Sequence, residues 1–328
     1  MPVSKNRRKG GKKAAKTHSP KVRSEPRDPQ VGDTETESMS DPALAREASM
    51  AGRAAMEAMM AQLQRGLLAS GPGPDHDDPL DQAQDLMYEA WDTPTKRDRI
   101  ALAKRALDLS GLCADAWSLL ANEAAKTVIE QRGYLEKAVA AGEAAVRDAL
   151  GLDAFEEEEG HFWGILETRP YMRARAALAE CLWDMGERQE AVAHWRDMLR
   201  LCPGDNLGLR HILGPKLLAQ NDFQAVRDLL DAYEEPDFAE WGYTDALLKF
   251  KRGGATSGAA KALKAAIRNN PHVPAYLLGA KLLPKSLPPH YGLGSKEEAV
   301  LYVINALETW TSTKGALAWL DDIAKNTL

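Results

Sequence analysis

Histidine and cysteine are the residues of this sequence best suited to metal binding or nucleophilic catalysis, so their spacing is the first test for an active site. The seven histidines are His18, His76, His161, His194, His211, His272 and His290. They form no HExxH pair and no other spacing typical of metal ligands. The three cysteines, Cys113, Cys181 and Cys202, are far apart and include no CxxC pair. We therefore expect reduced, buried thiols, no metal, no cofactor and no enzymatic activity.

Two further sequence features could carry chemistry. The glycine turns at 252–254 and 292–294 lack the lysine and threonine of a phosphate-binding loop. The acidic run at 156–159 could hold a divalent cation or a basic peptide. The alternative is a solvated connecting loop that Phe162 and Trp163 anchor to the body, and we prefer this second interpretation.

The charge of −6 hides a strong asymmetry along the chain. Residues 1–23 contain nine Lys/Arg and no acid, whereas the remainder carries 33 basic and 48 acidic residues. The tail could contact nucleic acid weakly and without sequence preference, because cations neutralise phosphates. The alternative, which we prefer, is a solubilising disordered end, since no aromatic residue is interleaved for base stacking. The tail residues proposed for nucleic-acid contact are Lys5, Arg7, Arg8, Lys9, Lys12 and Lys13.

Composition divides the chain into four predicted segments. Residues 1–40 are a disordered basic tail, since they have no apolar periodicity. Residues 41–70 form an Ala/Met-rich helix that begins at Asp41-Pro42, and 71–79 is a linker rich in Gly and Pro. The methionines of this helix are adaptable apolar surface, which packs on the body or binds a partner. The helical-repeat domain spans 80–328.

Three consecutive units of thirty-four residues, starting at 172, 206 and 240, place small or apolar residues at the same positions. The first has Ala179 and Ala191 where two helices must approach closely, Trp195 where a large residue fills the gap, and Gly186 at the turn. Gln220 replaces this glycine in the second unit. The pattern predicts an all-α, tetratricopeptide-like α-solenoid of antiparallel helix pairs.

Upstream, the repeat pattern is weaker. Residues 86–109 predict one helical pair around Thr93-Pro94, and 115–150 predict another with a longer connection. A break follows at 155–170. No stretch reaches the roughly 20 apolar residues that cross a bilayer, and the start has no secretory apolar region. We therefore expect a cytoplasmic protein with no membrane contact.

Four stretches resemble the suppressor-of-tumorigenicity-seven family. They are ADAWSLLANEAAKTV (114–128), YMRARAALAECLWDMGERQEAVAHWRDMLR (171–200), NNPHVPAYLLGAKLLP (269–284) and SKEEAVLYVINALETWTSTKGALAWL (295–320). The resemblance covers roughly residues 80–320 and implies a helical-repeat protein without catalytic residues to carry over. The animal members are membrane-associated and have apolar segments that are missing here, so we do not carry their location over to this chain.

The function expected from this architecture is that of an interaction scaffold or adaptor. First helices of stacked pairs line a concave groove, which suits a protein or peptide segment. The residues predicted to face it are Arg173, Glu180, Trp183, Arg210, Leu217, Trp241, Lys251 and Arg252. Tryptophan and arginine are common in binding hot spots. Alternatively, these residues pack against upstream or C-terminal helices. The second functional hypothesis is a nucleic-acid- or ribosome-associated accessory protein that acts through the basic tail.

Overall fold

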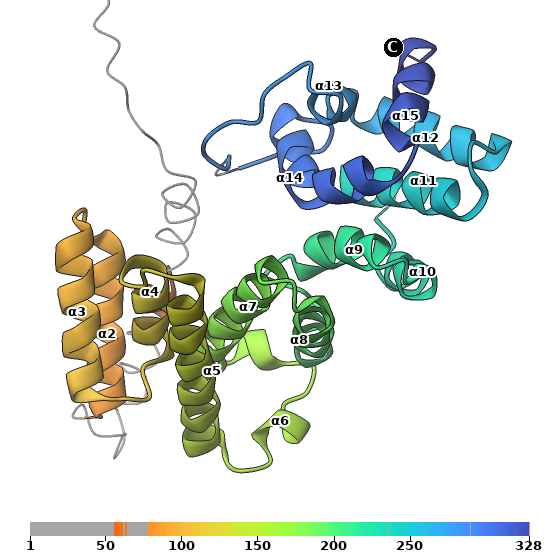
Figure 1. The fold of residues 1–328 in the computed structure, drawn as a ribbon. Coiled ribbons are helices and arrows are strands. Elements are labelled where there is room, and N and C mark those ends of the chain that lie inside the picture. Colours follow the sequence, from red (N-terminus) through yellow and green to blue (C-terminus); the bar gives the residue numbers. More distant parts are fainter. Residues whose placement is uncertain (1–55, 62, 64–77, 236, 289, 328) are drawn as a thin grey trace, which may run out of the picture. The chain divides into compact units, whose positions relative to one another are not determined.

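The computed structural model describes residues 56–61, 63, 78–235, 237–288 and 290–327 (Figure 1). The chain divides into two units, Met1–Met39 and Ser40–Leu328, and every described residue belongs to the second. The described residues contain helices and no strand. This confirms the all-α prediction. The predicted tail at 1–40 lies outside the described residues, as do residues 41–55, 62 and 64–70 of the predicted helix and residues 71–77 of the predicted linker at 71–79.

The upstream helices form two pairs with short connections. They are α2 (Pro79–Asp92), α3 (Lys96–Leu109), α4 (Ala114–Glu123) and α5 (Val128–Leu150). The prediction started the first pair too late, because Asp78 caps α2 by accepting a hydrogen bond from the Leu80 N–H, with Pro79 at the first helical position. The connection of the second pair, predicted to be the longer one, spans 124–127, against 93–95 in the first pair. The Thr127 side chain accepts from the Glu130 N–H, so α5 begins at Val128, five positions after the last residue of α4.

Short helical turns fill the predicted break before the first repeat. They are α6 (Ala154–Glu157), η1 (Phe162–Gly164) and η2 (Leu166–Thr168). Phe162 is fully buried and its ring lies 5.1 Å from that of Phe155 and 6.3 Å from that of Tyr171. These aromatic contacts hold the segment on α7, as the anchored-loop interpretation expected.

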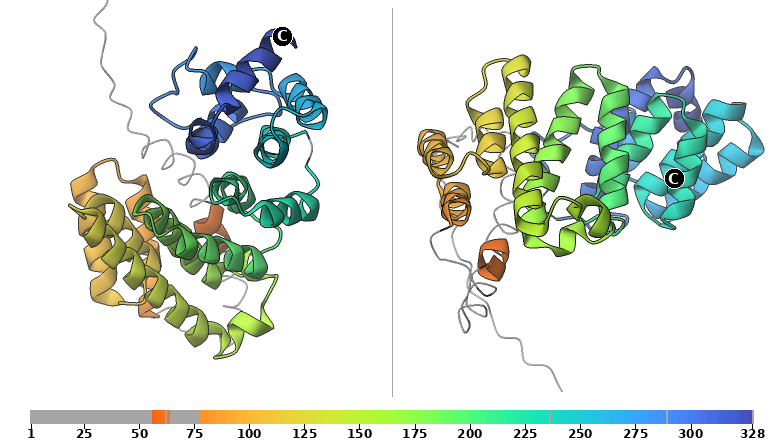
Figure 2. Two further views of the ribbon diagram at one scale, coloured as in Figure 1. Left: turned by 45° about the vertical axis from the view of Figure 1, so that its right-hand side comes forward. Right: turned by 90° about the horizontal axis from the view of Figure 1, so that it is seen from below.

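Each of the three predicted units contains a helix pair, and successive pairs follow one another along the second unit of the chain (Figure 2). The pairs are α7 (Arg169–Asp184) with α8 (Arg188–Leu201), α9 (Leu209–Ala219) with α10 (Phe223–Ala232), and α11 (Ala239–Gly253) with α12 (Ser257–Asn269). The turns of the first and third pairs use left-handed glycines, Gly186 and Gly254. In the second pair Asn221 takes that conformation, with φ 61°, so no glycine is needed.

The positions predicted to form the repeat core are largely buried. Ala179, Ala191, Trp195, Tyr243 and Leu263 are each at most 1% exposed. All three cysteines are buried and free. Ala232, at the end of α10, is the exception and is exposed.

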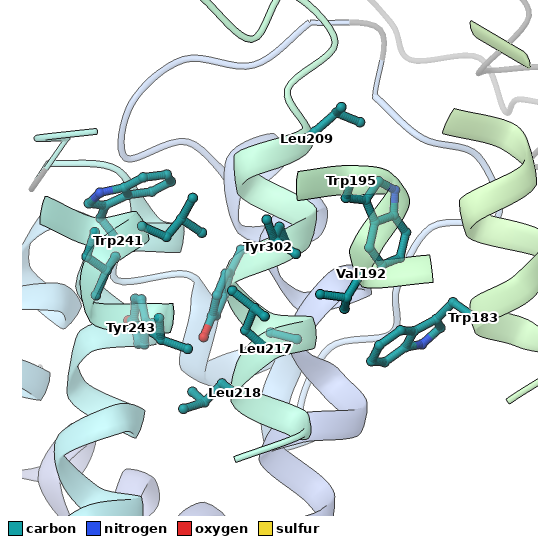
Figure 3. Close-up of a cluster of buried hydrophobic side chains, with 14 of the residues drawn as sticks. Trp183, Val192, Trp195, Leu209, Leu217, Leu218, Trp241, Tyr243 and Tyr302 are labelled. Atoms are coloured by element: carbon teal, nitrogen blue, oxygen red, sulfur yellow. The ribbon is translucent and has the colours of Figure 1, made fainter. Parts of the chain in front are cut away.

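The chain ends in α13 (Val273–Leu277), α14 (Lys296–Ser312) and α15 (Ala316–Lys325). Helix α14 packs along α9 and α11, the first helices of the second and third pairs. Figure 3 shows its Tyr302 among side chains of both helices. The Tyr302 ring lies 5.5 Å from that of Tyr243, and its hydroxyl accepts a 2.7 Å hydrogen bond from the Trp310 indole. Part of the face of α9 and α11 that a partner was expected to occupy is therefore taken by α14 of the same chain.

Candidate protein-interaction surface

The residues predicted to line a groove lie mostly inside the fold. Trp183, Leu217 and Trp241 are 6%, 2% and 6% exposed, which leaves little of them for a partner. Half-buried positions are held by Arg173, Glu180, Arg210 and Lys251, whereas Arg252 is exposed. The burial of the three apolar positions agrees with the alternative that they pack inside the fold, and Arg173 contacts the upstream helix α4 through Asp115. Partner binding by these residues stays a prediction.

Polar contacts fix α14 on the repeat helices. The Thr309 hydroxyl donates to the backbone oxygen of Pro215 in α9 at 3.0 Å. The Glu298 carboxylate accepts from the Ala239 N–H, the first residue of α11, at 2.9 Å. At the other end of α14, Glu308 pairs with Arg188 of α8. These contacts and the apolar packing make α14 an intramolecular occupant of this face.

Two predicted groove cations are likewise engaged within the fold. Arg210 donates to Glu235 at 2.8 Å and to Asp205 at 3.1 Å. Lys251 donates to the backbone oxygen of Leu218 at 2.8 Å. An anionic partner segment would have to compete with these oxygens.

Arg173 is the centre of a buried ionic cluster. Its guanidinium donates two hydrogen bonds to Asp115, of 3.0 and 2.6 Å, and two to Glu57, of 3.1 and 3.0 Å. Arg169 lies 3.5 Å from Glu57, and Arg173 stacks over the Trp91 ring with 5.5 Å to its centroid. Burial alone would lower the pKa of Arg173, but the two carboxylates outweigh burial and raise it. The cluster joins α2, α4 and α7 to the segment 56–63.

The helical residues 56–61 and 63, called the segment 56–63 here, are held by their inward face and leave an apolar outward face. Glu57 points inward and is 5% exposed. Met56, Met59, Met60 and Leu63 are 63%, 58%, 39% and 57% exposed. Their spacing of i, i+3, i+4 and i+7 places them on one side of a helix. Methionine fills irregular apolar gaps and is frequent at protein-binding surfaces. This stripe is the most concentrated exposed apolar helix face among the described residues.

A second polar cluster surrounds the N-terminus of α11. Asn270 donates to Glu298 at 2.8 Å, and the Gly294 N–H donates to the same carboxylate at 2.7 Å. Beside them, Glu240 is 5% exposed and its Oε2 has no partner within the described residues. Burial raises the pKa of Glu240 to about 8, and the carboxylates of Glu298 and Glu235 reinforce the shift. The carboxyl is thus mostly protonated at neutral pH.

The candidate nucleophiles and metal ligands are dispersed. Burial raises the pKa of Cys113 to about 12 and lowers that of His211 to about 4. His194, at the edge of the core, accepts a hydrogen bond from Arg175. Among the described residues, no three His, Cys, Asp or Glu side chains are grouped so that they could hold a metal ion.

The acidic run is connected to the body rather than free. Glu159 pairs with Arg200 of α8, while Glu156 and Glu157 are exposed. The six tail residues predicted to contact nucleic acid lie outside the described residues.

The sequence profile of the ST7 protein family matches residues 74–328. The chain belongs to the ST7 family. It is 33% identical over 264 residues to a chicken "Suppressor of tumorigenicity 7 protein-like", covering 73% of this chain and 46% of that protein. The human protein of the same description is 32% identical over 253 residues, covering 71% and 43%. The "Protein ST7 homolog" of Drosophila melanogaster is 30% identical over 256 residues, covering 71% and 47%.

The chain thus spans about half the length of these ST7 relatives. The matched region begins just before α2 and contains every helix from α2 to α15. The segment 56–63 lies outside it. None of the described helices is both long and apolar enough to cross a bilayer.

Sequence reasoning missed two parts of this surface. It did not identify Glu57 as the inward anchor of the methionine helix, although an acid within an Ala/Met-rich stretch was a usable signal. It also did not assign α14 to the face of α9 and α11. That contact joins residues 94 positions apart, such as Pro215 and Thr309, and leaves no local pattern.

Proposed function

We propose that this protein is an interaction scaffold that binds a protein partner. The observation that carries the proposal is the outward stripe of Met56, Met59, Met60 and Leu63 on a helix whose opposite side is fixed by Glu57. Apolar side chains at helical spacing on an anchored surface are suited to bind an apolar face of another protein. The contact surface proposed here replaces the groove as the primary one, because α14 already lies on α9 and α11.

The architecture supports the same function. The helix pairs hold α14 by apolar packing together with the Thr309 and Glu298 hydrogen bonds, which illustrates how this surface accommodates a helix. A groove-binding partner would have to displace α14. Substituting Trp241 or Leu217 would test folding rather than binding, because both side chains are buried.

The test compares native co-purification by three full-length proteins. The first is unchanged, the second carries Met56→Lys with Leu63→Lys, and the third carries Ile129→Lys with Leu152→Lys. Ile129 and Leu152 are 73% and 76% exposed, so the third variant matches the second in added charge and in the number of exposed apolar side chains replaced. We expect the stripe variant alone to lose partners that the other two retain. Recovery of the same proteins by all three would refute the proposed contact.

We also propose that the protein acts by binding and not by catalysis, and that it resides in the cytoplasm. Three free, buried cysteines support a reducing compartment. Fractionation of cells that contain the native protein tests the location, and recovery in a membrane or extracellular fraction would contradict it.

Nucleic-acid binding through the basic tail is the second candidate. It is supported by nine Lys/Arg without an acid in residues 1–23. Such contacts weaken steeply with salt, because binding releases counterions. The full chain and a chain without residues 1–25 should differ in RNA retention at low salt and converge at high salt. Equal retention at low salt would exclude this candidate.

A further inference from the structure

Helix α3 presents a basic face that the chain leaves uncovered. Lys96, Arg97, Ile100, Ala101 and Lys104 line a shallow hollow on this face. The three cations and Ala101 are exposed, and Ile100 is half-buried. Helix α3 packs on α2 and α4 (Figure 1). Its buried residues are Leu102, Ala103 and Ala106, and none of them lines the hollow.

The cations of this face have no carboxylate partner among the described residues. Within the part of the chain that the structure describes, the side chains of Lys96, Arg97, Lys104 and Arg105 form no ion pair or hydrogen bond. Other surface arginines do find carboxylates, as Arg196 does with Asp222 at 2.8 Å. Lys261, Lys264 and Arg268 on α12 also lack ion pairs among the described residues, so the α3 face is set apart by its hollow and not by the lack of partners alone.

The location of two of these cations is also electrostatically unfavourable for the isolated chain. Lys96 and Arg97 are the first two residues of α3, where the helix dipole is positive and acids are favoured. The single acid of that turn, Asp98, accepts from the Thr95 hydroxyl at 2.6 Å. Asp108 lies one turn beyond Lys104 and is the other acid on the helix. A bound anionic group would relieve the repulsion at the N-terminal end.

We propose that this face of α3 binds an acidic segment of a partner protein, with an apolar side chain of the segment on Ile100 and Ala101. Carboxylates of the segment then pair with Lys96, Arg97 and Lys104, as in recognition of acidic motifs by basic clusters. The inference rests on the proposed scaffold function and names the chemistry of the partner.

The composition of the hollow favours a peptide over a nucleic acid. Its floor is aliphatic, whereas a phosphate backbone has no apolar side chain to place there. None of its five lining residues is aromatic, so it has no platform for base stacking.

The experiment measures binding of three fluorescent probes to the full-length protein at physiological salt. The probes are a glutamate-rich peptide with a leucine at every fourth position, the same peptide with lysine in place of glutamate, and a single-stranded RNA. The test variant is K96E/R97E/K104E. The matched control is K261E/K264E/R268E on α12, which has the same charge change at three other cations without ion pairs among the described residues.

We expect the acidic peptide to bind the wild type and the α12 variant alike, and the α3 variant about tenfold more weakly. A third variant, Ala101→Lys, adds a cation but fills the hollow. It should also weaken binding, although charge alone would strengthen it. The thermal stability of each variant is checked by tryptophan fluorescence. Because Ala101 is exposed, Ala101→Lys should leave folding unchanged, so its effect on binding does not depend on stability.

Equal peptide binding by the α3 and α12 variants would overturn the inference, and so would stronger binding by Ala101→Lys. An α3 variant that loses RNA but retains the peptide would assign the face to nucleic acid instead. Wild-type self-association in sedimentation that K96E/R97E/K104E abolishes would assign it to a second copy. The scaffold proposal is tested separately by the Met56→Lys/Leu63→Lys variant. If that variant loses its partners, the scaffold function stands whatever the α3 variants show, and if it retains them, the scaffold proposal is refuted.

Discussion

Replacing Arg173 with methionine tests the ionic cluster that anchors the segment 56–63. The side chains of Arg173, Asp115 and Glu57 are 14%, 2% and 6% exposed. The substitution leaves both carboxylates buried without their principal cation, although Arg169 remains 3.5 Å from Glu57. Breaking a buried pair from one side costs roughly 3–5 kcal/mol, so we expect a loss of that order in the free energy of unfolding.

The assay is urea denaturation followed by tryptophan fluorescence, with Arg227→Met as the matched control. Arg227 pairs with Asp245 at 3.1 Å, but its side chain is 34% exposed. Pairs of this kind contribute about 0–1 kcal/mol. The triple variant E57Q/D115N/R173M removes all three charges and should regain most of the loss. The reasoning is refuted if Arg173→Met costs no more than Arg227→Met, or if the triple variant is as unstable as the single one.

Three other predictions concern the interior. Glu240→Gln should stabilise the protein above pH 5 by an amount that grows to roughly 4–5 kcal/mol near pH 8, measured by urea midpoints across this range. Gly142→Ala should destabilise the protein by about 1–3 kcal/mol, because the added Cβ would lie 2.8 Å from the Tyr171 Cα. Gly133→Ala is its control, since a Cβ there meets nothing within 4 Å. Cys113 should resist thiol reagents in the native protein and react on denaturation, because burial raises the pKa of its thiol to about 12.

The sign of the Glu240 effect follows from the raised pKa. The folded carboxyl has a pKa of about 8 against 4.5 in the unfolded chain, so the unfolded chain releases its proton first as pH rises. The contribution of the Glu240 carboxyl to stability is therefore fully present below pH 4.5 and is lost as the pH rises to about 8. Glu234→Gln, an exposed neighbour, should leave this pH dependence unchanged. Parallel pH profiles of stability for the wild type and Glu240→Gln would contradict the raised pKa of Glu240. Normal stability of Gly142→Ala would contradict the close approach of the Gly142 position to Tyr171. Rapid labelling of Cys113 in the native protein would contradict the protection of its thiol.

Local sequence patterns predicted the helix pairs because the packing of two helices within a pair constrains residues that are close together in the sequence. Ala179 and Ala191 had to be small where helices approach, and both are buried completely. Periodicity did not reveal the close approach of α5 to α7, which depends on Gly142 and Tyr171. A glycine within a helix signals such a contact only when the opposite helix is known.

The candidate surface was less predictable than the fold. A position within a repeat fixes the side of the helix on which a residue lies, but it does not fix what covers that side. Trp241 and Leu217 were assigned to a groove, and packing of α14 on α9 and α11 accounts for how little of that face is open. The methionine stripe was visible in the sequence, but its orientation depends on the pair formed by Glu57 and Arg173.

Hydrogen–deuterium exchange of the full-length protein, alone and with its co-purified partner, tests the central claim most directly. We predict slower amide exchange in the segment 56–63 when the partner is bound, with exchange in α14 unchanged. Unaltered exchange at 56–63, or faster exchange in α14 as the partner displaces it, would contradict binding at the methionine stripe.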